Sequence, residues 1–213
     1  MSGSLYIAVE GPIGVGKTTL VNRLSEKLQA RLVLEVVEEN PFLELFYADR
    51  ERYAFQAQLF FLMSRFRQQQ ELMQGDLFSP AILADYHLLK DRIFARLTLK
   101  DEELALYERV YTSLETHIVQ PDVLVYLHTS TDVLLDRIRQ RGRSFEADFD
   151  PVYLADLCDL YQHYFAHYDQ ACPLLTVDTT ALDYSRTDEA LDEVYSQIME
   201  IVSSSDRVDR QAR

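Results

Sequence analysis

The chain has 213 residues, and its 21 basic and 35 acidic side chains give a net charge of −14. A surface of this sign repels polyanions, which argues against a nucleic-acid polymer or an anionic membrane as partner. No apolar run approaches the roughly 18 residues of a spanning helix, and the N-terminus lacks the basic segment of a signal peptide. We therefore expect a cytoplasmic protein with a single domain, 1–202, and a polar, disordered tail, 203–213.

Short apolar runs alternate along the chain with segments of helical periodicity. This alternation predicts an α/β fold with a parallel sheet, because parallel strands need a helical crossover between them. The predicted strands are residues 5–10, 32–37, 81–86, 122–128 and 174–178.

The predicted helices show apolar residues three or four positions apart, which places them on one face. A helix also starts at Pro151, a residue favoured in the first turn, and the last helix follows Thr187. We interpret the aromatic stripes on these helices as core. The apolar positions of the first three helices are Leu20, Leu24 and Leu28; Phe55, Leu59, Leu62 and Phe66; and Leu104, Tyr107, Tyr111, Leu114 and Ile118.

The stretch after the first strand reads GPIGVGKTT and matches G-x-x-x-x-G-K-[ST] at every fixed position. Three of the chain's six glycines lie within its first six residues. Glycines let backbone N–H groups turn inward around phosphate oxygens, and the following helix adds its positive end. Lys17 reaches the β- and γ-phosphates, and Thr18 is placed to bind Mg²⁺. The donor nucleotide is expected at Gly11, Pro12, Ile13, Gly14, Val15, Gly16, Lys17, Thr18 and Thr19.

The phosphate loop does not identify the acceptor of the phosphoryl group. A GTP switch protein needs an N-K-x-D guanine reader, and the only asparagines, Asn22 and Asn40, are not followed by lysine. A motor or helicase usually needs a longer chain. A small-molecule kinase fits one domain of this size best.

In an open parallel sheet, ligands bind beyond the carboxyl ends of the strands. The second predicted strand ends near Glu35, Glu38 and Glu39, and the third near Asp85 and His87. A carboxylate there can take the acceptor's proton or help to hold Mg²⁺. For each glutamate a solvated loop charge competes with this interpretation, whereas Asp85, on an apolar strand, is harder to explain in that way.

Residues 137–143 read RIRQRGR, and their four arginines are among the chain's 21 basic residues. A solvated helix end is one interpretation of such a run. Because a phosphate loop is present in the same chain, we favour an arginine lid that stabilises the transferring phosphoryl group.

Five segments together resemble the deoxyribonucleoside kinase family, in particular its bacterial deoxyguanosine/deoxyadenosine kinase branch. They are EGPIGVGKTT, EVVEENPFLELFY, FQAQLFFLMSRFR, ADYHLLKDRIFA and RIRQRGRSFE, and the resemblance runs from about residue 5 to 201. It implies a P-loop NTPase-like three-layer sandwich, in which helices flank a five-stranded parallel sheet and an arginine-rich lid covers the site.

The resemblance also implies roles for individual residues. Glu35 resembles the general base that activates the sugar 5′-hydroxyl, although the nearby Glu38 is an alternative. Tyr47 and Glu146 resemble the pair that holds the 3′-hydroxyl. The remaining roles are contacts to the base for Gln58, Arg65 and Asp91, phosphate contacts from the lid for Arg137, Arg141 and Arg143, and a loop over the donor's adenine for Asp183 and Tyr184.

One triplet departs from the family pattern. Many relatives have an acidic residue, arginine and serine after the third strand, and this chain has Asp85, Tyr86 and His87. Asp85 keeps the carboxylate that serves Mg²⁺. Tyr86 stands among the substrate-binding positions in place of an arginine that neutralises the glutamate, and His87 is a candidate hydrogen-bond donor instead.

The resemblance implies an ATP- and Mg²⁺-dependent kinase that phosphorylates the 5′-hydroxyl of a purine deoxynucleoside, deoxyguanosine or deoxyadenosine, in nucleotide salvage. It also suggests a homodimer, or a heterodimer with a paralogous kinase, through helices at about 53–74 and 101–119. The alternatives are a kinase that accepts deoxycytidine, a nucleoside monophosphate kinase, and a non-catalytic regulatory subunit of a kinase pair.

Overall fold

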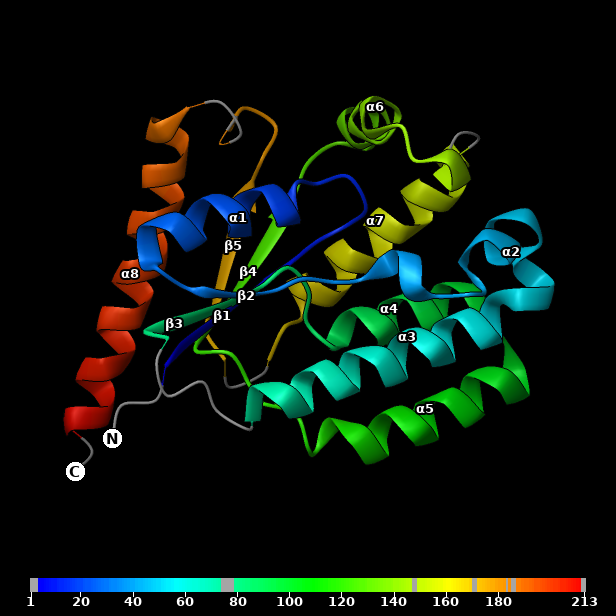
Figure 1. Cartoon of the computed structure of the whole chain (residues 1–213), viewed down its shortest axis with the longest axis horizontal. Helices are drawn as coiled ribbons and strands as arrows, with labels where there is room; N and C mark the ends of the chain where they lie inside the picture. Colours follow the sequence, from blue (N-terminus) through cyan, green and yellow to red (C-terminus); the bar gives the residue numbers. More distant parts are fainter. Residues whose placement is uncertain are drawn as a thin grey trace.

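The computed structural model describes residues 4–73, 79–146, 149–169, 172–182, 184 and 187–211. At its centre is a five-stranded parallel sheet with strand order β2-β3-β1-β4-β5 (Figure 1). The central strands read as continuous apolar runs because helices cover both faces. The strands are β1 (Leu5–Glu10), β2 (Arg31–Val33), β3 (Ala81–Ala84), β4 (Val123–His128) and β5 (Leu174–Asp178).

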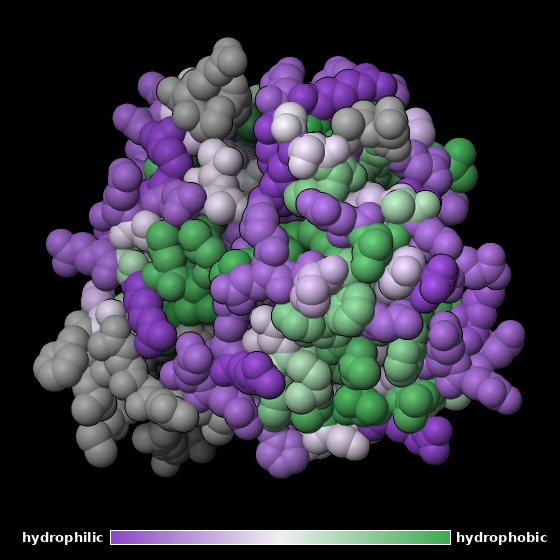
Figure 2. All heavy atoms as spheres, turned by 45° about the vertical axis from the view of Figure 1, so that its right-hand side comes forward, coloured by the Kyte–Doolittle hydropathy of each residue, from purple (hydrophilic) through white to green (hydrophobic). Residues whose placement is uncertain are grey.

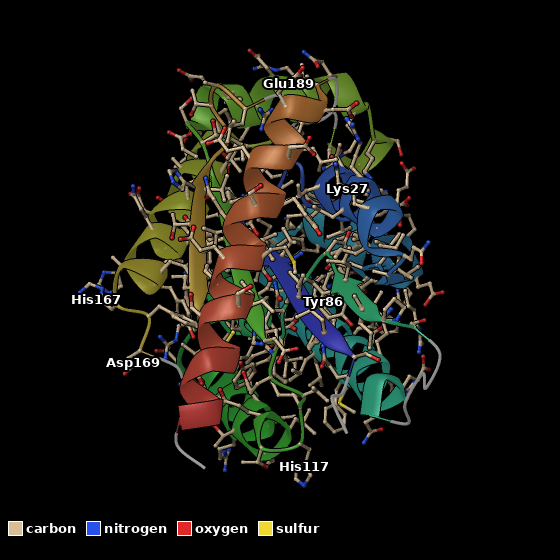
Figure 3. The ribbon with its side chains drawn as sticks, turned by 90° about the vertical axis from the view of Figure 1, so that its left-hand side faces the viewer. Lys27, Tyr86, His117, His167, Asp169 and Glu189 are labelled. Atoms are coloured by element: carbon tan, nitrogen blue, oxygen red, sulfur yellow. The ribbon has the colours of Figure 1, made fainter. Side chains whose placement is uncertain are left out.

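Helices form the layers on the two sides of this sheet (Figure 1). On one side lie α1 (Lys17–Leu28) and α8 (Asp188–Gln211), joined by the ion pairs Arg23–Asp188 and Lys27–Asp192; Figure 3 labels Lys27 on α1. The other side carries α4 (Leu89–Thr98) and α7 (Pro151–Ala166), with α3 (Arg50–Met73) and α5 (Asp101–Glu115) packed outside them. The shorter elements are η1 (Val37–Glu39), α2 (Leu43–Ala48), α6 (Thr131–Arg141) and η2 (Ser144–Glu146).

The chain has two apolar cores. The larger one lies between the sheet and helices α1, α4, α7 and α8, where the rings of Tyr126 and Phe165 stack 4.0 Å apart. The smaller one lies among the helices beyond α4, around Tyr107 and Tyr111. The interpretation of the aromatic stripes as core is confirmed for Tyr107, Tyr111 and Tyr161, which are fully buried, whereas Phe55 and Phe66 of α3 are only half-buried.

The predicted parallel sheet of five strands is confirmed, with two strands, the second and the third, ending earlier than expected. The second strand was predicted over 32–37 but ends at Val33. The reason is that the next backbone N–H available for pairing, that of Glu35, donates to the Asp85 side chain at 2.7 Å. The carboxylate thus replaces a strand partner and turns the chain out of the sheet. Likewise, β3 ends at Ala84 and not at residue 86.

The helix boundaries show what periodicity detects and what it misses. The start of α7 at Pro151 is confirmed, and the Asp150 side chain caps it by accepting from the Val152 N–H at 2.9 Å. Helix α4 was not predicted, because two of its buried positions are occupied by the charged residues Lys90 and Asp91, which interrupt the apolar periodicity. Helix α8 continues to Gln211, beyond the boundary at 202 predicted for the tail. Among the described residues, none of the helices combines the length and apolar character needed to cross a bilayer.

Candidate active site

The phosphate loop connects β1 to α1 and takes its shape from glycine. Gly14 and Gly16 have φ values of 83° and 103°, in the left-handed region that side chains disfavour. A Cβ atom on Gly16 would also lie 2.6 Å from the Tyr184 hydroxyl. Only glycine therefore fits at position 16, between the loop backbone and the aromatic ring that packs on it.

Lys17 and Thr18 start α1 and point in different directions. The Lys17 ammonium donates to the carbonyl oxygens of Gly11 at 2.7 Å and Pro12 at 3.1 Å. Burial, followed by the nearby charge of Lys90, lowers the pKa of Lys17 to about 8. The Thr18 hydroxyl donates to Asp85 at 2.6 Å. This contact joins the phosphate loop to the end of β3.

A cavity of about 700 Å³ opens over the phosphate loop. It is lined by residues 14–19, by residues 180–182 with Tyr184, and by the arginines of α6 and the segment after it. The Tyr184 hydroxyl donates to the Val15 carbonyl at 3.1 Å. Asp183, its predicted partner over the adenine, lies outside the described residues.

The three predicted lid arginines have different partners. Arg137 donates to the carbonyl oxygens of Val15 at 3.1 Å and Thr179 at 3.0 Å, so it links the phosphate loop to the segment after β5. Arg141 pairs with Glu146 at 2.6 Å. Arg143 pairs with Glu38 at 2.9 Å. Of the three, Arg141 and Arg143 also face the second cavity.

The second cavity, of about 110 Å³, adjoins the first and is lined by side chains from α2, α3, α4, α7 and η2. The two cavities share five lining residues at the junction: Gly14, Lys17, Thr18, Arg141 and Arg143. A group that passes from one cavity to the other therefore passes four polar or cationic side chains. Such an arrangement suits transfer of an anion.

Glu35 lies in the second cavity, where the chain leaves β2. Its carboxylate pairs with Arg65 of α3 and with Lys90 of α4, the latter at 2.6 Å. Burial acts to raise the pKa of Glu35, but the charges of Arg65 and Lys90 hold this pKa well below its usual range. Glu35 is therefore ionised at neutral pH and able to accept a hydrogen bond.

Glu38 lies in a different environment. Its side chain is 58% exposed, compared with 11% for Glu35, and it does not line the second cavity, although its partner Arg143 does. The geometry thus favours Glu35 over Glu38 as the carboxylate that faces an acceptor.

Four of the five predicted sugar and base contacts line the same cavity. Tyr47 and Glu146 line it together, and the Tyr47 ring lies 5.6 Å from the Phe145 ring. Gln58 and Arg65 of α3 also line it. The Gln58 amide donates to the Thr98 hydroxyl at 3.3 Å. Asp91 does not reach the cavity wall, because it is fully buried beneath Arg65 and pairs with that guanidinium.

Two residues of the triplet after β3 lie away from both cavities. Tyr86 is fully buried in the core beside β1 and β3, so the structure corrects its assignment as a substrate contact (Figure 3). His87 is also buried, and its Nδ1 accepts from the Leu89 N–H at 3.2 Å at the start of α4. It thus acts as a helix cap. Burial lowers the pKa of His87 to about 4.

Several cavity residues were missed by the sequence analysis. Lys90 is the most important, and it could have been noticed as a lone lysine inside the apolar run LLKDRIF just after a strand. The apolar walls are formed by Phe46, Phe61, Phe94 and Tyr153, which have no signal beyond helical periodicity.

The residues at the junction are suited to a nucleotide with its metal ion. Thr18 and Asp85 could supply two oxygen ligands for Mg²⁺, which commonly takes few ligands from protein and the rest from phosphate and water. Within the described part of the chain, no cluster of three or more His, Cys, Asp or Glu side chains could hold a metal by itself. The donor set thus fits an ion that arrives with the nucleotide.

Comparison with known proteins agrees with this geometry. Residues 7–203 match the family model described as deoxynucleoside kinase. The chain is 34% identical to a deoxyguanosine kinase of Bacillus subtilis over 206 residues, covering 95% of this chain and all of that protein. It is 30% identical to a deoxyadenosine/deoxycytidine kinase of the same organism, covering 94% of each chain.

A solved structure of similar fold is the deoxyadenosine kinase from M. mycoides with bound dCTP. It superimposes with a TM-score of 0.80 at 27% sequence identity, covering 92% of this chain and all of the other. The phosphate loop and the adjoining cavities fit a kinase of this family, and the family model matches nearly the whole length of the chain. The chain therefore belongs to the deoxynucleoside kinase family and is a phosphotransferase that acts on a nucleoside hydroxyl.

Proposed function

We propose that this kinase transfers the γ-phosphoryl group of ATP to the 5′-hydroxyl of a purine deoxynucleoside. The observation that supports this most strongly is the pair of adjoining cavities that meet at Lys17 and Thr18. The larger one holds the phosphate loop and suits the donor. The smaller one combines Glu35 with apolar and aromatic side chains, and the chemistry of this lining, more than its volume, suits a nucleoside.

In this proposal Glu35 is the catalytic carboxylate. Because Arg65 and Lys90 keep it ionised, it accepts the hydrogen bond of the 5′-hydroxyl and takes the proton as the new O–P bond forms. Thr18 and Asp85 would hold Mg²⁺, while Lys17, Arg141 and Arg143 stabilise the phosphoryl charge. When bound, ATP would supply the phosphoryl group and Mg²⁺ would partly neutralise its oxygens. Catalysis then depends mostly on position and charge.

The polar groups on the wall of the second cavity suit a nucleobase that carries hydrogen-bond donors and acceptors at its edge. Arg65 is held by Asp91 beneath it, and Gln58 lies on the same helix. The two Bacillus subtilis relatives are named for deoxyguanosine and for deoxyadenosine, which supports a purine, but the second is also named for deoxycytidine. Deoxycytidine therefore remains the second candidate. Each buried donor or acceptor left without a partner costs roughly 1–3 kcal/mol, which is enough to decide which base the kinase prefers.

A nucleoside monophosphate acceptor fits the cavity less well. Such an acceptor brings a second phosphate and needs cations that are free to bind it. Arg65 and Lys90 of the second cavity are already paired with Glu35 and Asp91. The arginines at its junction with the first cavity, Arg141 and Arg143, are paired with Glu146 and Glu38. The charge balance thus favours a neutral nucleoside.

The proposal is tested by Mg·ATP-dependent phosphorylation of deoxyguanosine, deoxyadenosine, deoxycytidine and thymidine, measured in parallel with one deoxynucleoside monophosphate. We expect the highest kcat/KM for a purine deoxynucleoside and no turnover of the monophosphate. A preference for deoxycytidine would contradict the purine assignment but keep the reaction. Turnover of the monophosphate alone would overturn the assignment of the acceptor.

A homodimer through α3 and α5 is also part of the proposal. Figure 2 shows apolar side chains gathered on the side of the molecule that carries these helices. On these two helices, Met63 of α3 is 37% exposed and Leu106 of α5 is 44% exposed. Burying such a surface against a second copy is favourable. Light scattering of the purified chain should give twice the monomer mass, and Leu106→Glu should shift it to the monomer. A mass of one chain at micromolar concentration would leave the paralogous heterodimer as the alternative.

A further inference from the structure

Lys90 is a buried lysine that the known features of a phosphate loop do not explain. It lies in the first turn of α4, and its side chain is only 9% exposed. Its ammonium donates to the Oε2 atom of Glu35 at 2.6 Å and lies 5.5 Å from the centre of the Phe94 ring. Because burying an ammonium is costly unless it is paired, this placement needs a reason.

The charges around Glu35 supply that reason. Arg65 pairs with Oε1 of Glu35 and also with Asp91, so one guanidinium serves two buried carboxylates. These three groups alone would carry a net charge of −1. With Lys90 the four groups are neutral, and both oxygens of Glu35 are held, each from a different helix.

Lys90 also faces other charged groups, and they do not account for it. Glu10 is a buried carboxylate near it, but Glu10 is already satisfied by the N–H groups of Gly11 at 2.8 Å and His87 at 2.9 Å and by the Tyr161 hydroxyl at 3.0 Å. Lys17 repels it. Glu35 is thus the carboxylate with which Lys90 makes direct contact. The groups that face the pair from the packed elements are Glu10, Lys17, Arg65, Asp85, Tyr86 and Tyr161.

We propose that Lys90 is a positioning residue that neutralises Glu35 and fixes its carboxylate toward the acceptor hydroxyl. Position 86 cannot supply this charge, since Tyr86 is neutral, fully buried and turned into the core. The cation that pairs with Glu35 therefore comes from the next element, where Lys90 lies in the first turn of α4. The inference rests on the proposed function, because it assigns Lys90 to the same step as Glu35.

The test compares Lys90→Met and Lys90→Arg with the surface control Lys100→Met, in the full chain with ATP and the preferred deoxynucleoside. We expect kcat to fall about 10²-fold in Lys90→Met, while the nucleoside dissociation constant, measured by calorimetry, changes less than about threefold. Lys90→Arg should recover most of kcat, since it restores the charge. Lys100 is exposed at the start of α5, and its substitution should change neither quantity.

A double-mutant cycle separates positioning from simple structural support. If Lys90 acts through Glu35, then Glu35→Gln with Lys90→Met should be no slower than Glu35→Gln alone, within about threefold. Full additivity, or an unchanged kcat in Lys90→Met, would overturn the proposal. If Lys90→Met does not fold, as judged by thermal unfolding, the Lys90→Arg and Lys90→Gln pair carries the same comparison. A wild-type enzyme that phosphorylates no nucleoside would instead overturn the proposed function itself.

Discussion

The donor side and the acceptor side of the site are built in opposite ways. The phosphate loop is one contiguous stretch, and the Lys17 ammonium donates hydrogen bonds to the carbonyl oxygens of Gly11 and Pro12 within it. The acceptor cavity is assembled from α2, α3, α4, α7 and η2, and Glu35 pairs there with Arg65 of α3 and Lys90 of α4. The phosphate-binding loop is thus defined locally, although the rest of its cavity comes from α6 and residues 180–182 with Tyr184, whereas the walls of the acceptor cavity come from elements distant in the chain.

This difference has a functional consequence. Changes in the phosphate loop should affect transfer to every acceptor in the same way, since all acceptors use the same donor. Changes in the acceptor cavity should affect some substrates more than others, because each contact is made by a separate element. The variants below test this division.

The largest effect is expected from Lys17→Met. Removing a cation that stabilises the transferring phosphoryl group should lower kcat on the order of 10⁴-fold, and by the same factor for every deoxynucleoside. Steady-state kinetics with two acceptors measures this. Lys27→Met, on the exposed face of α1, is the matched control and should keep full activity. Unequal losses with the two acceptors would contradict the local character of the donor side.

The next largest effect is expected from Glu35→Gln. Without the carboxylate, the 5′-hydroxyl loses its proton acceptor, and kcat should fall about 10³-fold with little change in substrate affinity. The control is Glu38→Gln, which removes a carboxylate that is 58% exposed and paired with Arg143. We expect less than about threefold change there. The reverse result would make Glu38 the catalytic residue.

A smaller and more selective effect is expected from Tyr47→Phe. If its hydroxyl holds the 3′-hydroxyl of the sugar, KM for a deoxynucleoside should rise about tenfold. KM for the corresponding 2′,3′-dideoxynucleoside should not change, since that substrate has no 3′-hydroxyl. Tyr53→Phe, outside both cavities, is the control. An equal rise with both substrates would show that Tyr47 does not contact the 3′-hydroxyl.

The smallest effect concerns stability. The pKa of His87 is lowered to about 4 by burial, compared with 6.5 for an exposed histidine. The unfolded chain therefore binds a proton that the folded chain refuses between pH 6.5 and about 4. The free energy of unfolding should fall with decreasing pH in this window, by at most about 1.4 kcal/mol per pH unit for one proton.

Urea unfolding at several pH values, compared with His87→Asn, isolates this contribution. Asparagine keeps a hydrogen-bond acceptor for the Leu89 N–H but has no charge to gain. The difference in unfolding free energy between the two proteins should change with pH only below about 6.5. A difference that stays constant down to pH 4 would show that His87 titrates normally.

The sequence predicted the elements with a strong local signal. The phosphate loop, the five strands and the buried aromatic faces follow from spacing and composition. The position of Glu35 at the end of the second strand was also visible, but its distinction from Glu38 was not. That distinction depends on Asp85, whose side chain accepts a hydrogen bond from the Glu35 N–H and directs this part of the chain toward the second cavity. No pattern within the segment itself contains this contact.

Lys90 and Tyr86 show the same limit. A tyrosine after a strand can face a cavity or the core, and a lysine in the next helix can face solvent or a carboxylate. Packing decided both: Tyr86 fills the core, and Lys90 points to Glu35. The sequence by itself thus determined the fold class and the phosphate loop, because backbone geometry and periodicity are local properties. Only the tertiary structure decided which charges meet at Glu35, since burial and pairing depend on elements distant in the chain.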